Sequence, residues 1–142
     1  MAGPERRLQA EEGQRWLQHA ERGIAAAERA IAMPPALPDI AAYHCQQAVE
    51  KLLKGLLVAG AIRPRKTHDL DFLADEVGSV WPALAPLAEP LRRCTTWGFA
   101  YRYPLPEEEP APTVAEIRAT LAQIEDLRRA VVGLVEGAKK SR

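Results

Sequence analysis

The apolar residues of this chain recur three and four positions apart, and this periodicity constrains the fold more than any other feature. Side chains at that spacing share one face of an α-helix, whereas a half-buried strand alternates apolar and polar residues. No segment alternates in this way without also permitting a helical interpretation, so strands are not indicated. We therefore expect an all-α protein, an antiparallel, up-and-down bundle of four to five helices. The expected helices cover about residues 5–32, 39–60, 67–78, 83–100 and 113–137.

Prolines set several of the expected boundaries. Residues 33–38 contain three prolines, which cannot continue the first helix, while Pro38 and Asp39 are favourable first residues for the second. Gly60 is a plausible end for that second helix. Further prolines recur every four residues, at 82, 86 and 90, so we expect the helix over 83–100 to be short and broken.

Capping residues predict where the other helices begin. Thr67 is well placed to be the N-cap of a short helix that begins at His68. Thr113 and Glu116 have the spacing of a capping box at the start of the last helix. The short helix would bury Leu70, Leu73, Ala74 and Val77.

Length and charge exclude several classes of protein. A chain of 142 residues is long enough for one domain but not for two cores. Its 19 Lys and Arg residues balance 19 Asp and Glu residues, so any basic site must be local. Cys45 and Cys94 stand far apart without metal or disulfide spacing, which predicts free thiols, no metal site and a cytoplasmic protein. No stretch reaches the roughly eighteen apolar residues of a membrane span, so no membrane association is expected.

The expected second helix has two clearly separated faces. Its apolar face consists of Ala41, Cys45, Ala48, Val49, Leu52, Leu53 and Leu56. Its polar face consists of Tyr43, His44, Gln46, Gln47, Glu50, Lys51 and Lys54. One interpretation is a solvated face on which Glu50 and Lys54 form an ion pair. Another is a binding surface, because amides and an imidazole select hydrogen-bonding partners and lysines supply charge to a phosphate.

Two further polar clusters permit a similar choice of interpretations. The first, "KTHDL" at residues 66–70, is either a helix start or part of a site. The second, "YRYP" at residues 101–104, places Arg102 between Tyr101 and Tyr103, where it can bind phosphate or stack on a base. Tyrosines before a proline also commonly anchor a loop on a core.

Together the three clusters resemble the small HEPN (higher eukaryotes and prokaryotes nucleotide-binding) domains of bacteria and archaea. The likeness covers nearly the whole chain and is most specific in residues 43–61 and 66–77, and weakest in residues 16–31. It implies a helical bundle that usually forms a dimer and that is often encoded beside a minimal nucleotidyltransferase. The family's motif positions correspond to Gln47, Glu50, Lys51, Lys54, Thr67, His68, Asp69, Arg102, Tyr103 and Pro104.

The chain departs from the family pattern in two places. Gly23 stands where the first helix usually carries an aspartate. Ribonuclease members carry a histidine that is separated from the arginine by four to six residues, but after Arg102 those positions are occupied by glutamates 107–109. Arg63 and His68 have the right spacing but lie before the third helix, so we interpret that match as a coincidence.

These observations lead to three hypotheses. The first is a non-catalytic module that binds a nucleotide or RNA, or that pairs with a minimal nucleotidyltransferase as in a toxin–antitoxin pair. The second is a ribonuclease toxin with a non-standard pair, such as Arg102 with His44 or His68. The third is a protein interface without nucleotide binding. We expect no catalytic residue, no cofactor and no metal, and a nucleotide site formed by His44, Gln47, Glu50, Lys51, Lys54, His68, Asp69, Tyr101, Arg102 and Tyr103.

The chain is also expected to form a homodimer. It has more bulky apolar side chains than one small helical core readily encloses, so some of them would lie between two copies. A two-fold arrangement would then place both polar faces near one shared groove. The side chains on which this prediction rests are Leu52, Leu53, Leu56, Leu57, Trp81, Trp97 and Phe99.

Overall fold

Helices account for the regular structure of the protein. The computed structural model describes residues 3–97 and 111–140, and no strand occurs in those ranges, which confirms the expected all-α bundle. The elements, in chain order, are α1 (Pro4–Ala32), α2 (Pro38–Ala59), α3 (Leu70–Val80), the 3₁₀ helix η1 (Pro82–Leu84), α4 (Ala85–Ala88), the 3₁₀ helix η2 (Glu89–Cys94) and α6 (Val114–Lys140).

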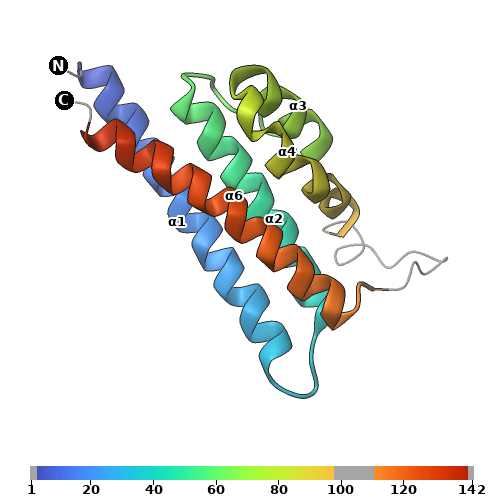
Figure 1. The fold of residues 1–142 in the computed structure, drawn as a ribbon. Coiled ribbons are helices and arrows are strands. Elements are labelled where there is room, and N and C mark those ends of the chain that lie inside the picture. The colour runs from blue at the N-terminus through green and yellow to red at the C-terminus, as the bar shows by residue number, and fades with distance from the viewer. Residues whose placement is uncertain (1–2, 98–110, 141–142) are drawn as a thin grey trace.

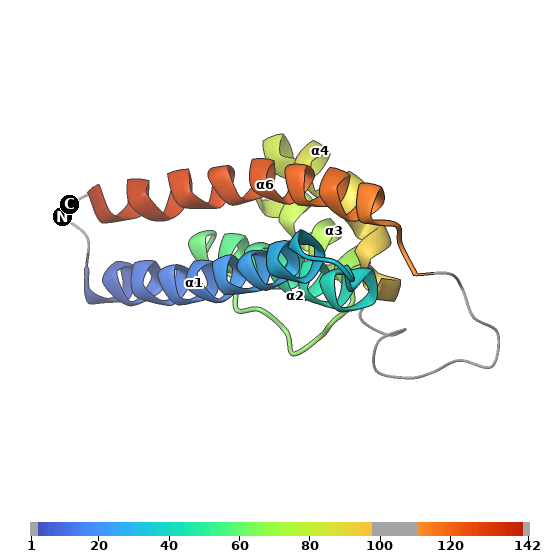
Figure 2. The same cartoon turned by 90° about the horizontal axis from the view of Figure 1, so that it is seen from below.

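Three long helices form the frame of the bundle. α1 runs antiparallel to α2, and α6 crosses over both of them, so that the start of α1 and the end of α6 lie at the same end of the bundle (Figure 1). α3 and the broken segment from η1 to η2 pack beside α2 on the side away from α1. The view turned by 90° shows that α6 lies in one layer and that α1 and α2 lie in another (Figure 2). α2 is thus the central helix, covered by a different element on each side.

Small residues allow α1 and α2 to approach closely. A Cβ atom added to Gly23 would lie 3.4 Å from both the Ala48 Cβ and the His44 carbonyl oxygen, and one added to Gly55 would lie 3.4 Å from the Trp16 Cβ. Such contacts leave room for at most a methyl group at these positions. The buried small residues repeat every seven positions on both helices, as Gly13, Ala20 and Ala27 on α1 and as Ala41, Ala48 and Gly55 on α2.

A single chain encloses the leucines of α2. Leu52, Leu53, Leu56 and Leu57 are at most 1% exposed. Trp81 is half-buried and donates its indole N–H to the Leu56 carbonyl at 2.8 Å. The expectation that these leucines need a second copy to be buried is therefore wrong, because α1, α3, the broken segment and α6 cover α2 from several sides. Trp97 is half-buried, and Phe99 lies outside the described residues.

α3 begins later than its predicted cap would require. The helix starts at Leu70, and the Asp69 carboxylate accepts hydrogen bonds from the backbone N–H groups of Asp71 and Phe72. Thr67 instead accepts a hydrogen bond from the Asp69 N–H at 3.1 Å. The prediction of Thr67 as the N-cap is thus wrong by two positions. The predicted buried stripe of this helix is confirmed as Leu70, Leu73, Ala74 and Val77.

The broken helix and the last cap follow the sequence more closely. Prolines divide residues 82–94 into η1, α4 and η2, as expected from their spacing. At the start of α6, the Glu116 N–H donates to the Thr113 hydroxyl at 3.1 Å, which confirms that half of the capping box. The other half differs, because the Glu116 carboxylate accepts from the Thr113 hydroxyl at 3.3 Å. None of the described helices has an apolar stretch sufficient to cross a bilayer.

Candidate functional site

A buried carboxylate forms the centre of the polar cluster on α2. The Glu50 side chain is fully buried, and both of its oxygens have partners. Lys51 Nζ lies 3.0 Å and Lys54 Nζ 3.3 Å from Oε2. His68 Nδ1 lies 2.6 Å from Oε1. We call these four residues the Glu50 cluster.

The surroundings of Glu50 keep its carboxylate ionised. Burial by itself would raise the pKa of this carboxyl, because the charged form loses its hydration. The hydrogen bond from His68, the hydrogen bond and charge of Lys51, and the charge of Lys54 together outweigh that effect. The pKa of Glu50 is consequently held below its ordinary value.

Trp16 of α1 completes the environment of the two lysines. Lys51 Nζ lies 5.4 Å and Lys54 Nζ 5.7 Å from the centre of its ring, within the range of a cation–π interaction. Trp16 thereby joins α1 to the Glu50 cluster. No local signal in the sequence indicates that the ring of Trp16 faces two lysines.

The polar face of α2 is not a solvated face. Gln46, Glu50 and Lys54 are buried, although the Glu50–Lys54 ion pair forms as expected. Gln47 donates its amide to the Gln46 side-chain oxygen at 2.7 Å, and Gln46 makes a long hydrogen bond of 3.5 Å to the His68 carbonyl. These contacts join α2 to the connection that precedes α3. The spacing of residues within one helix could not reveal them.

Two members of the Glu50 cluster remain accessible from outside. The His68 side chain is 65% exposed and that of Lys51 26% exposed, whereas that of Lys54 is only 7% exposed. Because Nδ1 of His68 faces Glu50, its Nε2 is the ring nitrogen that is available to other groups. The cluster carries one carboxylate and two ammonium groups, so it keeps a net positive charge.

The remaining predicted site residues lie elsewhere or beyond the described chain. His44 packs its ring against Tyr43 with centroids 5.3 Å apart, and no hydrogen bond or ion pair among the described residues joins it to the Glu50 cluster. Asp69 is engaged in capping α3. Tyr101, Arg102 and Tyr103 lie outside the described residues, as does Pro104.

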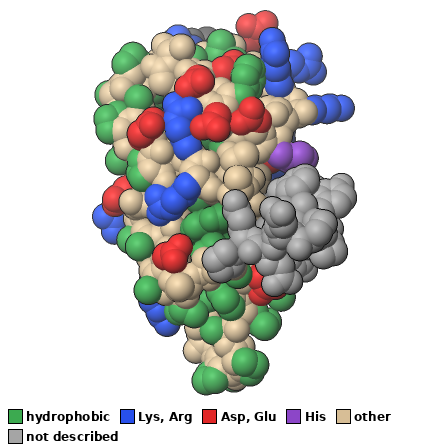
Figure 3. All heavy atoms as spheres, turned by 90° about the vertical axis from the view of Figure 1, so that its right-hand side faces the viewer, with side chains coloured by type: hydrophobic (Ala, Val, Ile, Leu, Met, Phe, Trp, Pro, Cys, Tyr) green, Lys and Arg blue, Asp and Glu red, His purple; other side chains and the backbone are tan. Residues whose placement is uncertain are grey.

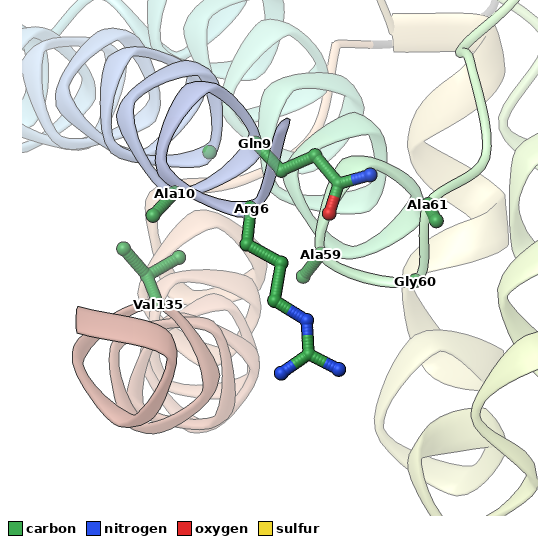
Figure 4. A pocket seen from close by; sticks show the side chains of 8 residues that line it. Arg6, Gln9, Ala10, Ala59, Gly60, Ala61 and Val135 are labelled. Carbon is green, nitrogen blue, oxygen red and sulfur yellow. The ribbon is translucent and has the colours of Figure 1, made fainter. Parts of the chain in front are cut away.

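A cavity of about 380 Å³ lies at another place in the bundle (Figure 4). Arg6 and Gln9 of α1, Gly60 after α2 and Val135 of α6 line it. None of the predicted site residues contributes to its wall. In the ranges that the structure covers, no group of acidic, histidine and cysteine side chains is arranged to hold a metal ion.

A family model matches most of the chain, including the residues of the Glu50 cluster. The model of the HEPN domain family matches residues 14–136, a range that contains α2, α3 and the whole cluster. No curated protein and no solved structure matches the chain. Because the family model covers most of the sequence, this protein belongs to the HEPN domain family.

Proposed function

We propose that this HEPN domain protein is a non-catalytic module that binds a nucleotide or RNA through phosphate. The observation that carries the proposal is the net positive Glu50 cluster, which brings the accessible side chains of Lys51 and His68 together at one carboxylate. The buried carboxylate restrains both side chains, so they lose little freedom when an anion binds. An ammonium group has three donors, and Lys51 uses only one of them on Glu50.

Calorimetric titration with nucleoside triphosphates and short RNA tests this proposal. Lys51→Met keeps a flexible aliphatic side chain but removes the charge, and we expect an affinity loss of about tenfold. Arg29→Met is the matched control, because Arg29 is exposed on α1 and forms no ion pair with a described residue. Equal affinities for the wild type and Lys51→Met would remove the Glu50 cluster from the binding site.

Partner binding belongs to the same proposal. A HEPN chain of this kind would pair with a minimal nucleotidyltransferase as in a toxin–antitoxin system, and the test is co-purification with the product of a neighbouring gene of that class. A wild-type protein that binds such a partner, but neither nucleotides nor RNA, would favour the interpretation as a protein interface alone.

The contact between Glu50 and His68 supports ribonuclease activity as a second candidate function. A buried carboxylate that accepts from Nδ1 leaves the lone pair on Nε2, the arrangement of a general base. Nε2 would take the proton of a ribose 2′-hydroxyl while that oxygen attacks the adjacent phosphorus. The products would be a cyclic phosphate and a 5′-hydroxyl, whose oxygen takes up a proton from water.

Incubation with end-labelled RNA in a chelating buffer distinguishes the two candidates. Under the ribonuclease hypothesis, His68→Gln abolishes cleavage, whereas His19→Gln, a change at an exposed histidine of α1, leaves it unchanged. Intact RNA after incubation with the wild type would exclude the second candidate and leave the binding module.

A further inference from the structure

A second group of cations lies beside the Glu50 cluster, in the connection between α2 and α3. Arg63, Arg65 and Lys66 are all exposed, and no acidic residue occurs between positions 60 and 68. Figure 2 shows this connection bowing away from the helices. On the face drawn in Figure 3, Lys and Arg side chains project together at the upper right, with a histidine below them. We call residues 63–66 the basic connection.

The acidic residues that follow the basic connection form their contacts with other groups. Asp69 accepts the backbone N–H groups at the start of α3, and Asp71 and Asp75 pair with Arg92 at 3.3 and 2.7 Å. Within the described part of the chain, Arg63, Arg65 and Lys66 form no ion pair. Residues 63–69 carry three Lys or Arg side chains and one carboxylate, so the local charge is positive although the whole chain has a formal net charge of zero.

Contacts on both sides hold the basic connection in place. After it, His68 is bound to Glu50 at 2.6 Å, and before it, the Ile62 N–H donates to the Leu57 carbonyl at 2.8 Å. Inside it, the Arg65 guanidinium lies 5.1 Å from the centre of the Phe72 ring. These contacts reduce the entropy that the segment would lose on binding a ligand.

The spacing of the cations favours an extended ligand over a compact one. Arg63 and Lys66 are three residues apart, a separation that spans at most about 10 Å of backbone. Over roughly that length a stacked strand, with a rise of about 3.4 Å per nucleotide, presents about three phosphates. Arg65 contributes a planar guanidinium, on which an unpaired base can stack, and an acidic peptide has no such base.

We propose that the basic connection binds the phosphodiester backbone of a single-stranded nucleic acid, with one base stacked on Arg65. This inference rests on the proposed function and assigns the strand a site next to the Glu50 cluster. Binding would depend on salt more than on base sequence, because the charges contact phosphates. Three phosphate contacts correspond to a slope of about −2 in a plot of log affinity against log salt concentration.

Fluorescence anisotropy with a short labelled RNA tests the site. The triple variant Arg63→Gln, Arg65→Gln, Lys66→Gln should weaken binding by about tenfold or more and flatten the salt slope by about 2. The matched control Arg15→Gln, Arg22→Gln, Arg29→Gln removes the same number of exposed cations from α1 and should leave both quantities unchanged. Circular dichroism confirms that both variants remain folded.

The ligand class is tested by competition. Unlabelled single-stranded RNA or DNA should displace the probe far more effectively than ATP or polyglutamate at the same charge concentration. Displacement by ATP or polyglutamate at equal effectiveness would overturn the proposal of a strand as ligand. RNA binding that is lost in Lys51→Met but unchanged in the connection variant would overturn this inference and keep the proposed function. A wild type that binds neither RNA nor nucleotides would overturn both.

Discussion

At the scale of single residues, Glu50 decides how the polar face of α2 is used. Its carboxylate is fully buried and is surrounded by Lys51, Lys54 and His68. The sequence predicted the pair with Lys54 from the four-residue spacing, and the resemblance drew attention to His68. The sequence could not predict that Glu50 is buried, because the groups that cover this face are distant from it along the chain. These groups are Trp16 and the connection before α3.

Glu50→Gln should destabilise the fold by about 3 kcal/mol, because it leaves the ammonium of Lys54 buried without a counter-charge. Urea denaturation measures the change in the free energy of unfolding. The double variant Glu50→Leu, Lys54→Met removes both charges and should recover much of that loss. A double variant less stable than Glu50→Gln would show that hydrogen bonding by Glu50 matters more than its charge balance.

The free energy of unfolding should decrease at acidic pH, over a pH range that is determined by the pKa of Glu50. The pKa of Glu50 is below its ordinary value of 4.5 in the folded state, so the unfolded chain takes up the proton first as the pH falls. The stabilisation by Glu50 is therefore complete above about pH 4.5 and is lost as the pH falls through the folded pKa. The difference in unfolding free energy between the wild type and Glu50→Gln should shrink across this window, and a constant difference would contradict the lowered pKa.

At the scale of elements, glycines determine how closely the helices can pack. Gly23 lies in the middle of α1 against α2, where an added Cβ meets atoms at an ordinary contact distance of 3.4 Å. Gly60 ends α2, and an added Cβ there would overlap the Val80 Cγ1 of α3. The sequence does not show how much space surrounds each glycine. Only the packing of the neighbouring helices distinguishes the two positions.

Alanine substitutions at these two glycines should have opposite effects. Gly23→Ala should stabilise the protein by up to about 1 kcal/mol, because alanine favours the helix and fits the contact. Gly60→Ala should destabilise it by about 1 to 3 kcal/mol, because Val80 and the helix that carries it must shift. Thermal unfolding of the two variants beside the wild type measures both changes, and a destabilised Gly23→Ala would mean that α1 and α2 cannot separate by even a few tenths of an ångström.

The start of α3 shows why boundaries are harder to predict than helices. Thr67 and Asp69 are both favourable N-caps, and local propensity does not choose between them. In the fold, the bond from His68 to Glu50 fixes the chain just before the helix, and Asp69 then caps it. The choice depends on a contact with α2, eighteen residues earlier in the chain.

At the scale of the whole molecule, the number of bulky apolar side chains no longer indicates a dimer, because one chain buries most of them. The leucines of α2 that were expected between two copies are buried within a single bundle. Periodicity predicted which residues form the core, but not how completely four neighbouring elements cover α2. The described large apolar side chains that remain exposed are Leu8, Met33, Leu37 and Ile62.

A homodimer nevertheless remains our expectation, and the distribution of those four side chains predicts its character. Leu8 and Met33 lie near opposite ends of α1, about 37 Å apart along the helix, so the described surface has no single apolar face that contains them all. An interface between copies would accordingly draw on polar and charged groups, and its stability would decrease with added salt. Light scattering coupled to size exclusion should give twice the mass of 15.6 kDa at micromolar concentration and a lower average mass at high salt. A monomer mass under all conditions would exclude the dimer, and a mass that does not respond to salt would instead indicate an apolar interface formed by residues beyond the described ranges.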